Sequence, residues 1–244
     1  MFTSQIVHKL APHSEGITSM SRQFEEQLDE LKNRMLFMGS LVEHAIHLSI
    51  QAMCERDEQP AMRVIAEIEP QVNDLHLELD DRALQLLSLQ QPLAADLRFI
   101  TSTMKINSDL ERIGDQAVNI AQRALSIVSQ PELKPLVDIP LMADIVKKMV
   151  KDALDAFVQK NTDLARDVVL RDDEVDQYRD LVFRELVPLM AKNPACIQLA
   201  LDLILVSRNL ERIADHATNV AEDVIYMVLG RDIRHRAEER VLPR

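Results

Sequence analysis

A stretch of twenty residues occurs twice in this chain, and this repeat constrains the fold more than any other feature. Residues 109–128 read DLERIGDQAVNIAQRALSIV, and residues 209–228 read NLERIADHATNVAEDVIYMV. Nine of the twenty positions are identical at a constant offset of 100, whereas unrelated sequences of typical composition would share about one or two. Each copy follows a proline-marked turn and an apolar stretch, which indicates a chain built from two similar halves.

Both copies of the repeat carry apolar residues at helical spacing. Intervals of three and four alternate along the chain, and this places one apolar seam on a single side of a helix. The seam residues are Leu110, Ile113, Ala117, Ile120, Ala124 and Ile127 in the first copy, and Leu210, Ile213, Ala217, Val220, Val224 and Met227 in the second. Helices with such seams must pack on one another, and short turns make neighbours antiparallel.

Prolines divide the chain into six amphipathic segments, which we expect to be helices at 19–56, 60–90, 93–130, 140–160, 162–191 and 194–229. With only 4 Gly, no Trp and 3% aromatic residues, sandwiches and barrels are disfavoured. The predicted fold is all-α, with two antiparallel three-helix bundles related by internal duplication. The expected parts are a flexible N-terminal segment 1–18, a first bundle 19–130, a Pro-rich linker 131–139, a second bundle 140–230 and a C-terminal tail 231–244.

Three residues within or beside these segments predict local geometry. Pro70 should kink the second segment or restart it near Glu69, and Pro188 should end or bend the fifth. Gly230 follows the last apolar position and is predicted to close the final helix in a left-handed conformation.

Acidic side chains repeat along with the apolar seam. Glu111 and Asp115 are four residues apart, as are Glu211 and Asp215, and residues at this spacing share one face of a helix. The rows lie on the flank of the helix, beside the seam. Because like charges at this spacing repel by a few tenths of a kcal/mol, their presence in both halves favours a bound cation or a specific partner.

A neighbouring helix in each half offers further oxygen ligands. In the second half Asp172 and Asp176 flank Val175, and in the first half Glu69 and Asn73 flank Val72. The predicted metal sites are therefore Asp172, Asp176, Glu211 and Asp215 in the second half, and Glu69, Asn73, Glu111 and Asp115 in the first. Hard multivalent cations prefer such ligands. The amide of Asn73 brings no charge, so the first site should bind metal more weakly, and the spacing does not choose among iron, manganese, magnesium and zinc.

Simpler readings of the same side chains remain open. The acid rows also suit a solvated surface with local ion pairs, such as Arg112 with Asp115, Arg212 with Asp215 and Arg208 with Glu211. His216 adjoins Asp215 and is a candidate neighbour of the second site. Glu43, His44 and His47 share one helix but do not form an HExxH motif, so a helix-surface role is favoured there.

Composition excludes several classes of protein. The formal net charge of −12 argues against binding to nucleic acid, which requires a basic surface. No apolar run reaches the length of a membrane span or a secretory signal. Cys54 and Cys196 lack a CxxC spacing and are predicted to be reduced core residues of a cytoplasmic protein. Signatures of catalytic residues are absent, and a di-iron oxidase would need Glu-x-x-His pairs directed into the bundle core.

The duplicated LERIGD and LERIAD motifs, with QQPLAADLR before the first and VLGRDIRH after the second, resemble the PhoU family from about residue 20 to 236. The resemblance implies two three-helix bundles. It also implies iron or zinc clusters on the bundle surface, held through Glu111 and Asp115, Glu211 and Asp215, and Asp172 and Asp176. Asn73 departs from the family pattern, and Asp96 and Arg98 fall in the signature turn, where a helix cap or an ion pair is the simplest interpretation.

The resemblance further implies a non-enzymatic negative regulator of phosphate uptake and of the phosphate regulon. Such a protein would act as a cytoplasmic adaptor between a phosphate-specific ABC transporter, through its ATPase subunit, and a sensor histidine kinase. It would reach the membrane only through these partners and would form a homodimer or a larger homo-oligomer. The alternatives are a metal-dependent helical-bundle enzyme or metal store, and a purely structural helical module.

Overall fold

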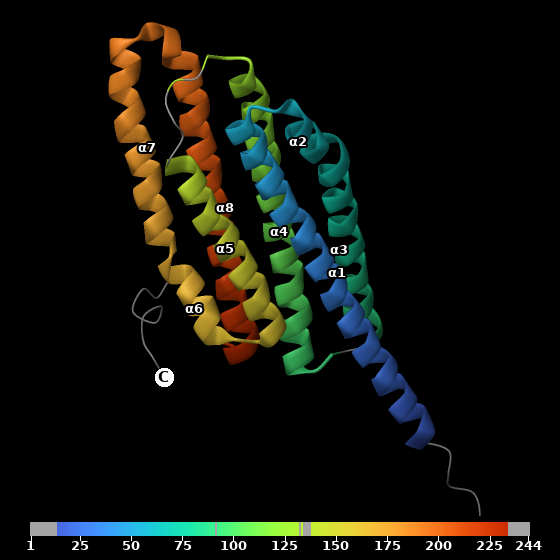
Figure 1. Ribbon diagram of the computed structural model, residues 1–244. Coiled ribbons are helices and arrows are strands. Elements are labelled where there is room, and N and C mark those ends of the chain that lie inside the picture. Colours follow the sequence, from blue (N-terminus) through green and yellow to red (C-terminus); the bar gives the residue numbers. More distant parts are fainter. Residues whose placement is uncertain (1–13, 91, 132, 134–137, 234–244) are drawn as a thin grey trace, which may run out of the picture.

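The computed structural model describes residues 14–90, 92–131, 133 and 138–233, and within them every regular element is helical (Figure 1). The elements are α1 (Ser14–Glu55), α2 (Glu58–Arg63), a π-helical turn η1 (Val64–Ile68), α3 (Glu69–Gln90), α4 (Ala94–Val128), α5 (Asp138–Gln159), α6 (Thr162–Leu170), α7 (Asp172–Lys192), a 3₁₀ turn η2 (Pro194–Cys196) and α8 (Ile197–Leu229). The predicted all-α fold with two three-helix bundles is confirmed.

Each bundle consists of two long helices and one interrupted helical segment. In the first half α1 packs on α3 and α4, with α2 and η1 preceding α3, and in the second half α5 packs on α6, α7 and α8. The two bundles also pack on each other, because α4 contacts α8 and α1 contacts α5. Helices α3, α4, α8 and α7 thus lie side by side in one layer, and α1 and α5 cover one side of it (Figure 1).

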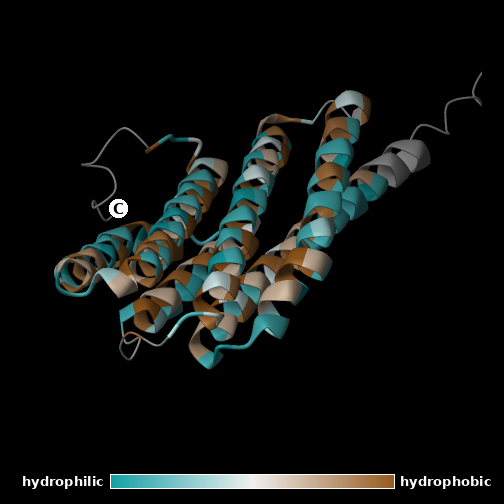
Figure 2. Ribbon diagram, turned by 90° about the horizontal axis from the view of Figure 1, so that it is seen from above, coloured by the Kyte–Doolittle hydropathy of each residue, from teal (hydrophilic) through white to brown (hydrophobic). Residues whose placement is uncertain are grey.

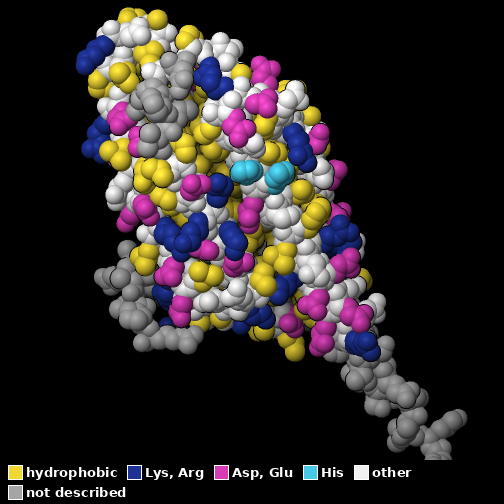
Figure 3. Space-filling view, viewed as in Figure 1, with side chains coloured by type: hydrophobic (Ala, Val, Ile, Leu, Met, Phe, Trp, Pro, Cys, Tyr) yellow, Lys and Arg dark blue, Asp and Glu magenta, His cyan; other side chains and the backbone are white. Residues whose placement is uncertain are grey.

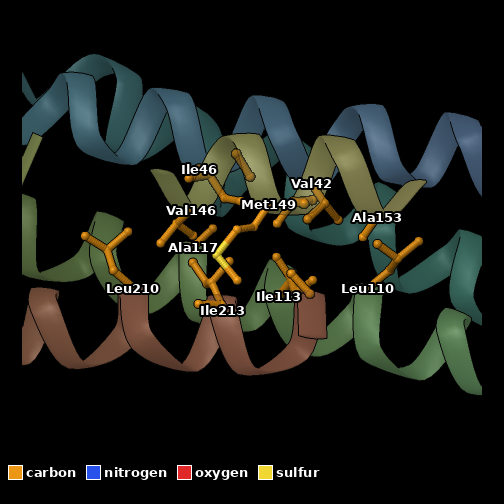
Figure 4. Close-up of a cluster of buried hydrophobic side chains, with 14 of the residues drawn as sticks. Val42, Ile46, Leu110, Ile113, Ala117, Val146, Met149, Ala153, Leu210 and Ile213 are labelled. Carbon is orange, nitrogen blue, oxygen red and sulfur yellow. The ribbon is translucent and has the colours of Figure 1, made fainter. Parts of the chain in front are cut away.

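A single hydrophobic core joins the two halves. Brown and teal residues alternate along the helical ribbons in Figure 2, as expected of amphipathic helices. Figure 4 shows where α1, α4, α5 and α8 meet, with side chains from these four helices directed toward one another. The labelled residues are Val42, Ile46, Leu110, Ile113, Ala117, Val146, Met149, Ala153, Leu210 and Ile213. Leu110, Ile113, Leu210 and Ile213 are fully buried, as the seam spacing predicted.

Several predicted boundaries are confirmed and others shift. Asp57 caps α2 by accepting a hydrogen bond from the amide of Gln59 at 3.0 Å. The second segment does restart at Glu69, directly after the π-helical turn. Gly230 adopts φ 66° and its amide donates to Tyr226 O at 2.8 Å, which is the predicted left-handed helix end.

Prolines mark these boundaries only approximately. Pro188 lies inside α7, which runs on to Lys192 and so ends one residue after the predicted segment; the interruption of this segment at Arg171, between α6 and α7, was not predicted. Helix α5 begins at Asp138, two residues before the predicted start, so Pro140 lies in its first turn, where a helix needs no amide donor. Most of the predicted linker, residues 1–13 of the N-terminal segment and residues 234–244 of the tail lie outside the described residues, although α1 already begins at Ser14.

Cys54 was wrongly assigned to the core. Its side chain is exposed near the end of α1, whereas Cys196 is buried as predicted. None of the helices in the described ranges has the length and hydropathy needed to cross a membrane.

Candidate functional site

The two acidic rows lie where the helical spacing placed them. Glu111 and Glu211 are partly exposed beside buried seam residues, and Asp115 and Asp215 are exposed one turn further along α4 and α8. Because α4 and α8 occupy the middle of the four-helix layer, both rows reach the surface near the centre of the molecule.

In the second half, α7 brings a second acidic residue to the row on α8. Asp176 on α7 and Glu211 on α8 each accept a hydrogen bond from the guanidinium of Arg179, both at 2.7 Å from Nη1. The Nη2 group of Arg179 also contacts Asp180 at 2.9 Å. One positive charge therefore neutralises part of a cluster of four carboxylates, which we call the acidic cluster: Asp176, Asp180, Glu211 and Asp215.

Asp215 interacts electrostatically with two other members of the acidic cluster. Loss of hydration raises the pKa of the Asp215 carboxyl, and the negative charges of Glu211 and Asp176 raise it further. The hydrogen bond to Asp180 raises the pKa of Arg179, with a further contribution from Glu211. Asp215 therefore carries an incompletely compensated charge that a cation or a basic side chain would stabilise.

The structure thus brings together three of the four residues predicted for the second site. Asp176, Glu211 and Asp215 interact directly or through Arg179, while Asp172 is the first residue of α7, one helical turn earlier. Sequence analysis did not identify Arg179, although its position three residues after Asp176 on the same helix was visible in the sequence.

The predicted first site is more open. Glu69 and Glu111 are half-buried, whereas Asn73 and Asp115 are exposed. Helices α3 and α4 approach closely beside them, since a methyl group added at Gly114 would lie 3.3 Å from Val72 Cγ1.

The histidine that replaces Arg179 in the first half points elsewhere. His76 takes the place on α3 that Arg179 takes on α7, and its Nε2 lies 3.9 Å from Asp80 Oδ2. Asp80 also accepts a hydrogen bond from Asn107 Nδ2 at 3.0 Å. The first site therefore has fewer carboxylates and no bridging guanidinium among the contacts described.

The donor set of the acidic cluster suits a hard cation, because every available ligand atom is an oxygen. As the side chains stand, no three Asp, Glu, His or Cys groups in the described ranges form a metal-binding group. Arg179 occupies the position between Asp176 and Glu211. A cation would therefore bind only as the guanidinium moves aside, and metal binding stays a prediction.

The local ion pairs that the sequence suggested are replaced by longer-range ones. Glu211 pairs with Arg179 of α7. His216 contacts Asp109 of α4, with Nδ1 2.8 Å from Oδ1, so it links the two halves. Asn219 donates to the same carboxylate at 3.3 Å.

Polar contacts at the junction of α4 and α8 escaped the sequence analysis. Asp202 is fully buried and accepts hydrogen bonds from Ser126, Gln130, Gln198 and Arg123, at 2.9 to 3.4 Å. At the other end of this junction, Lys105 Nζ lies 3.4 Å from Asp223 Oδ1. A lone acidic residue inside the apolar run LALDLILV was the signal for the first of these contacts.

The signature turn has a structural role. Asp96 lies in the first turn of α4, where a carboxylate interacts favourably with the helix dipole. Arg98 donates from Nε to Met227 O at 3.4 Å, so it contacts the end of α8.

Comparison with known proteins decides the family. The model of the PhoU domain matches this chain twice, at residues 35–124 and 139–224. The chain belongs to the PhoU family. A PhoU homolog of *Pseudomonas putida*, named as a phosphate-specific transport system accessory protein, is 40% identical over 223 residues, covering 91% of this chain and 87% of the relative. The homolog of *Aquifex aeolicus* is also 40% identical, over 86% of this chain and 95% of its own length.

Solved PhoU structures share the fold. The crystal structure of PhoU from *Pseudomonas aeruginosa* is 38% identical with a TM-score of 0.82, covering 85% of this chain and all of that one. The phosphate transport system regulatory protein PhoU from *Streptococcus pneumoniae* is 27% identical with a TM-score of 0.80, covering 86% and 98%. The PhoU relatives are named as accessory and regulatory proteins, which supports the expectation that this chain is not an enzyme.

Proposed function

We propose that this chain is a regulatory accessory protein of phosphate-specific transport, which lowers phosphate uptake and represses the phosphate regulon when phosphate is plentiful. The observation that carries this proposal is the double match to the PhoU domain, together with 40% identity to an accessory protein over most of both chains. The chain acts as a cytoplasmic adaptor between the ATPase subunit of a phosphate-specific ABC transporter and a sensor histidine kinase.

The shape and charge of the fold suit an adaptor. Its outer helices present broad faces, and proteins with a formal net charge of −12 attract basic surfaces over several ångströms. In Figure 3 acidic and basic side chains intermix on the side that carries α1 and α5. The acidic cluster lies on α7 and α8 instead, where an adaptor can bind basic side chains of a partner.

The acidic cluster is also the proposed cation site, and the acidic row of the first half is proposed as a second site that binds a cation more weakly. Asp176, Glu211 and Asp215 would hold a multivalent cation such as iron, zinc, manganese or magnesium, and Glu69, Asn73, Glu111 and Asp115 a second one. Burial raises the pKa of Asp215 and the negative charges of Glu211 and Asp176 add to this, which supports the proposal because a cation would relieve the repulsion among these carboxylates. Bound metal would order this surface for a partner.

Affinity purification tests the adaptor role. The tagged chain is expressed from its own promoter, and complexes are recovered from phosphate-rich and phosphate-starved cells. We expect the transporter ATPase subunit and the kinase to be enriched over a tagged chain in which the partner face is blocked by Glu211→Arg and Asp215→Arg. Recovery of neither partner in either medium would refute the proposal, whereas metal-dependent oxidation or hydrolysis by the purified chain would favour a metalloenzyme.

The oligomeric state follows as a second part of the proposal. We expect a homodimer or a larger homo-oligomer, and light scattering at several concentrations measures it directly. A monomer at every concentration up to that used in the partner-binding assays would contradict this part alone.

A further inference from the structure

An approximate twofold axis relates the two halves of this single chain. Lys105 on α4 pairs with Asp223 on α8, Asp109 pairs with His216, and Arg123 pairs with Asp202. As the residue number rises along α4, the number of the partner on α8 falls, so the two helices are antiparallel. Since these helices carry the repeated sequence, the axis passes between them near Ile113 and Ile213 (Figure 4).

This axis runs through the layer of α3, α4, α8 and α7. Because α1 and α5 cover one side of the layer, the other side is an open surface, which we call the four-helix face; it is the side turned away from the viewer in Figure 1. The axis relates any feature of α3 and α4 on this face to an equivalent feature of α7 and α8.

Helical phase directs exposed apolar residues to the four-helix face. Arg82 pairs with Glu30 of α1, and Phe99 lines a pocket with Leu28 of α1. Leu84 and Leu97 are each two residues, or about 200°, from one of these side chains, so they lie on the other side of the layer, and the approximate axis gives α7 and α8 equivalent residues.

The exposed apolar residues form equivalent pairs in the two halves. Leu97 on α4 and Ile197 on α8 are 43% and 42% exposed, at the repeat offset of 100. Leu84 on α3 and Val187 on α7, which follow the equivalent residues Val72 and Val175 by the same twelve positions, are 53% and 38% exposed. Each half therefore has an apolar area at its own end of the face.

The two apolar areas are far apart. Leu97 lies in the first turn of α4 and Ile197 is the first residue of α8. Since these helices are antiparallel, the two residues are separated by nearly the length of α4, or about 45 Å at 1.5 Å per residue. A partner that contacts both areas must therefore present two equivalent contacts at this spacing, with a twofold axis between them.

Between the apolar areas the charge is unbalanced. In the second half four carboxylates share the guanidinium of Arg179. In the first half Glu111 and Asp115 occupy the equivalent row on α4, and Glu69 begins the neighbouring helix α3. Arg112, Arg208 and Arg212 are exposed next to these rows and offset part of the charge, but together with Arg179 they are still fewer than the acidic residues. A complementary partner carries basic side chains on both sides of its own twofold axis.

We propose that the four-helix face binds a protein homodimer whose twofold axis coincides with the approximate axis of this chain. Each subunit places an apolar side chain at one end of the face and basic side chains over one acidic row. One chain therefore binds two partner subunits. The inference rests on the proposed adaptor function and specifies how the partner binds.

The two ends of the face are not identical, and this makes the second half the stronger contact. Phe183, Leu201 and Leu205 are exposed there, where the first half has Asp80, Thr101 and Lys105 at the equivalent positions. Additional buried apolar area strengthens an interface. A substitution at Val187 should therefore weaken binding more than the same substitution at Leu84.

The probe for the experiment is the purified ATPase subunit of the phosphate transporter from the same organism, with ATP present. Native mass spectrometry gives the stoichiometry and titration calorimetry the dissociation constant. We expect one chain per two ATPase subunits, with a dissociation constant raised about tenfold by Leu84→Glu and more by Val187→Glu. Leu141→Glu is the matched control, because Leu141 is 46% exposed on α5, outside the four-helix face. Circular dichroism confirms that each variant is folded.

Each result decides between distinct conclusions. One chain per ATPase subunit, or an effect of Val187→Glu without any effect of Leu84→Glu, would overturn the twofold binding mode and leave the adaptor function standing. A homodimer of this chain that both variants dissociate would assign the face to self-association and would also overturn it. No binding of the wild-type chain would refute the ATPase subunit as the proposed partner, and with it this inference.

Discussion

Arg179→Gln separates a cation site from a purely structural ion-pair cluster. The guanidinium bridges Asp176 and Glu211, with Nη1 2.7 Å from an oxygen of each. Gln keeps a polar side chain of moderate length but removes the positive charge. If a divalent cation binds the same carboxylates, the variant should bind it more tightly, because the competing charge is gone.

The size of the effect follows from Coulomb's law. A cation that shares a carboxylate with the guanidinium would lie about 5 Å from its positive charge, and the cluster is partly exposed to water. With the dielectric constant of water, the repulsion between a double and a single positive charge at that distance is about 1.7 kcal/mol. Its removal corresponds to an affinity gain of about 15-fold.

Titration calorimetry with MnCl₂ measures the dissociation constant in a chelator-free buffer. Arg184→Gln is the control, since Arg184 lies on the same helix but donates from Nε to the backbone oxygen of Asp180. We expect Arg184→Gln to leave the manganese affinity within twofold of the wild-type value. Equal affinities for wild type and Arg179→Gln, or no manganese binding by either, would refute the idea that metal and guanidinium share these ligands.

Three further predictions concern stability. Burial and the charge of Glu211 raise the pKa of Asp215, so the ionised carboxylate destabilises the folded chain. The contribution of Asp215 to the free energy of unfolding is therefore fully present at low pH and is lost as the pH rises through the raised pKa. Asp215→Asn should therefore stabilise the chain at pH 7 by about 0.3 kcal/mol, and urea titrations should show this gain vanishing below pH 3.8. Asp202→Ala leaves the hydroxyl of the half-buried Ser126 without its acceptor and removes the carboxylate that pairs with Arg123, which should cost about 2–3 kcal/mol. The expected fall in Tm is about 4–12 °C in calorimetry, and a fall under 2 °C would contradict it. Gly230→Ala forces an alanine into the left-handed conformation and should lower the free energy of unfolding by about 1 kcal/mol. Urea denaturation measures this change, and an unchanged midpoint would contradict the prediction.

The sequence was sufficient to predict the helices and the buried side of each. Leu110 and Leu210 are buried and Glu111 and Glu211 are partly exposed because helical periodicity alone sets their direction. The left-handed conformation of Gly230 was also predictable, because the geometry of a helix end depends on local conformation.

Contacts between helices could not be predicted in this way. Helical phase shows which side of α8 faces outward, but not which residue of α7 lies opposite Glu211. The guanidinium of Arg179 extends across that gap because its side chain is long. His216 was a candidate neighbour of the second site because it adjoins Asp215, whereas its partner Asp109 belongs to the other half of the chain.

Cys54 shows the limit of composition as a guide to burial. Cysteine is among the most buried residue types, yet Cys54 lies on the outer side of α1 near its end. Near a helix end, one face loses its neighbours, so residue type is a weaker guide to exposure there than in mid-helix.

The single core shared by both halves has an evolutionary consequence. A half-length ancestor with the sequence of one bundle would have exposed the apolar side of its last helix, and pairing with a second copy about the same axis would have buried it. The present chain therefore has the arrangement of a dimer within a single polypeptide. Its halves need not be identical: the second has Asp202 and His216 where the first has Ser102 and Gln116, and these differences distinguish the two halves chemically.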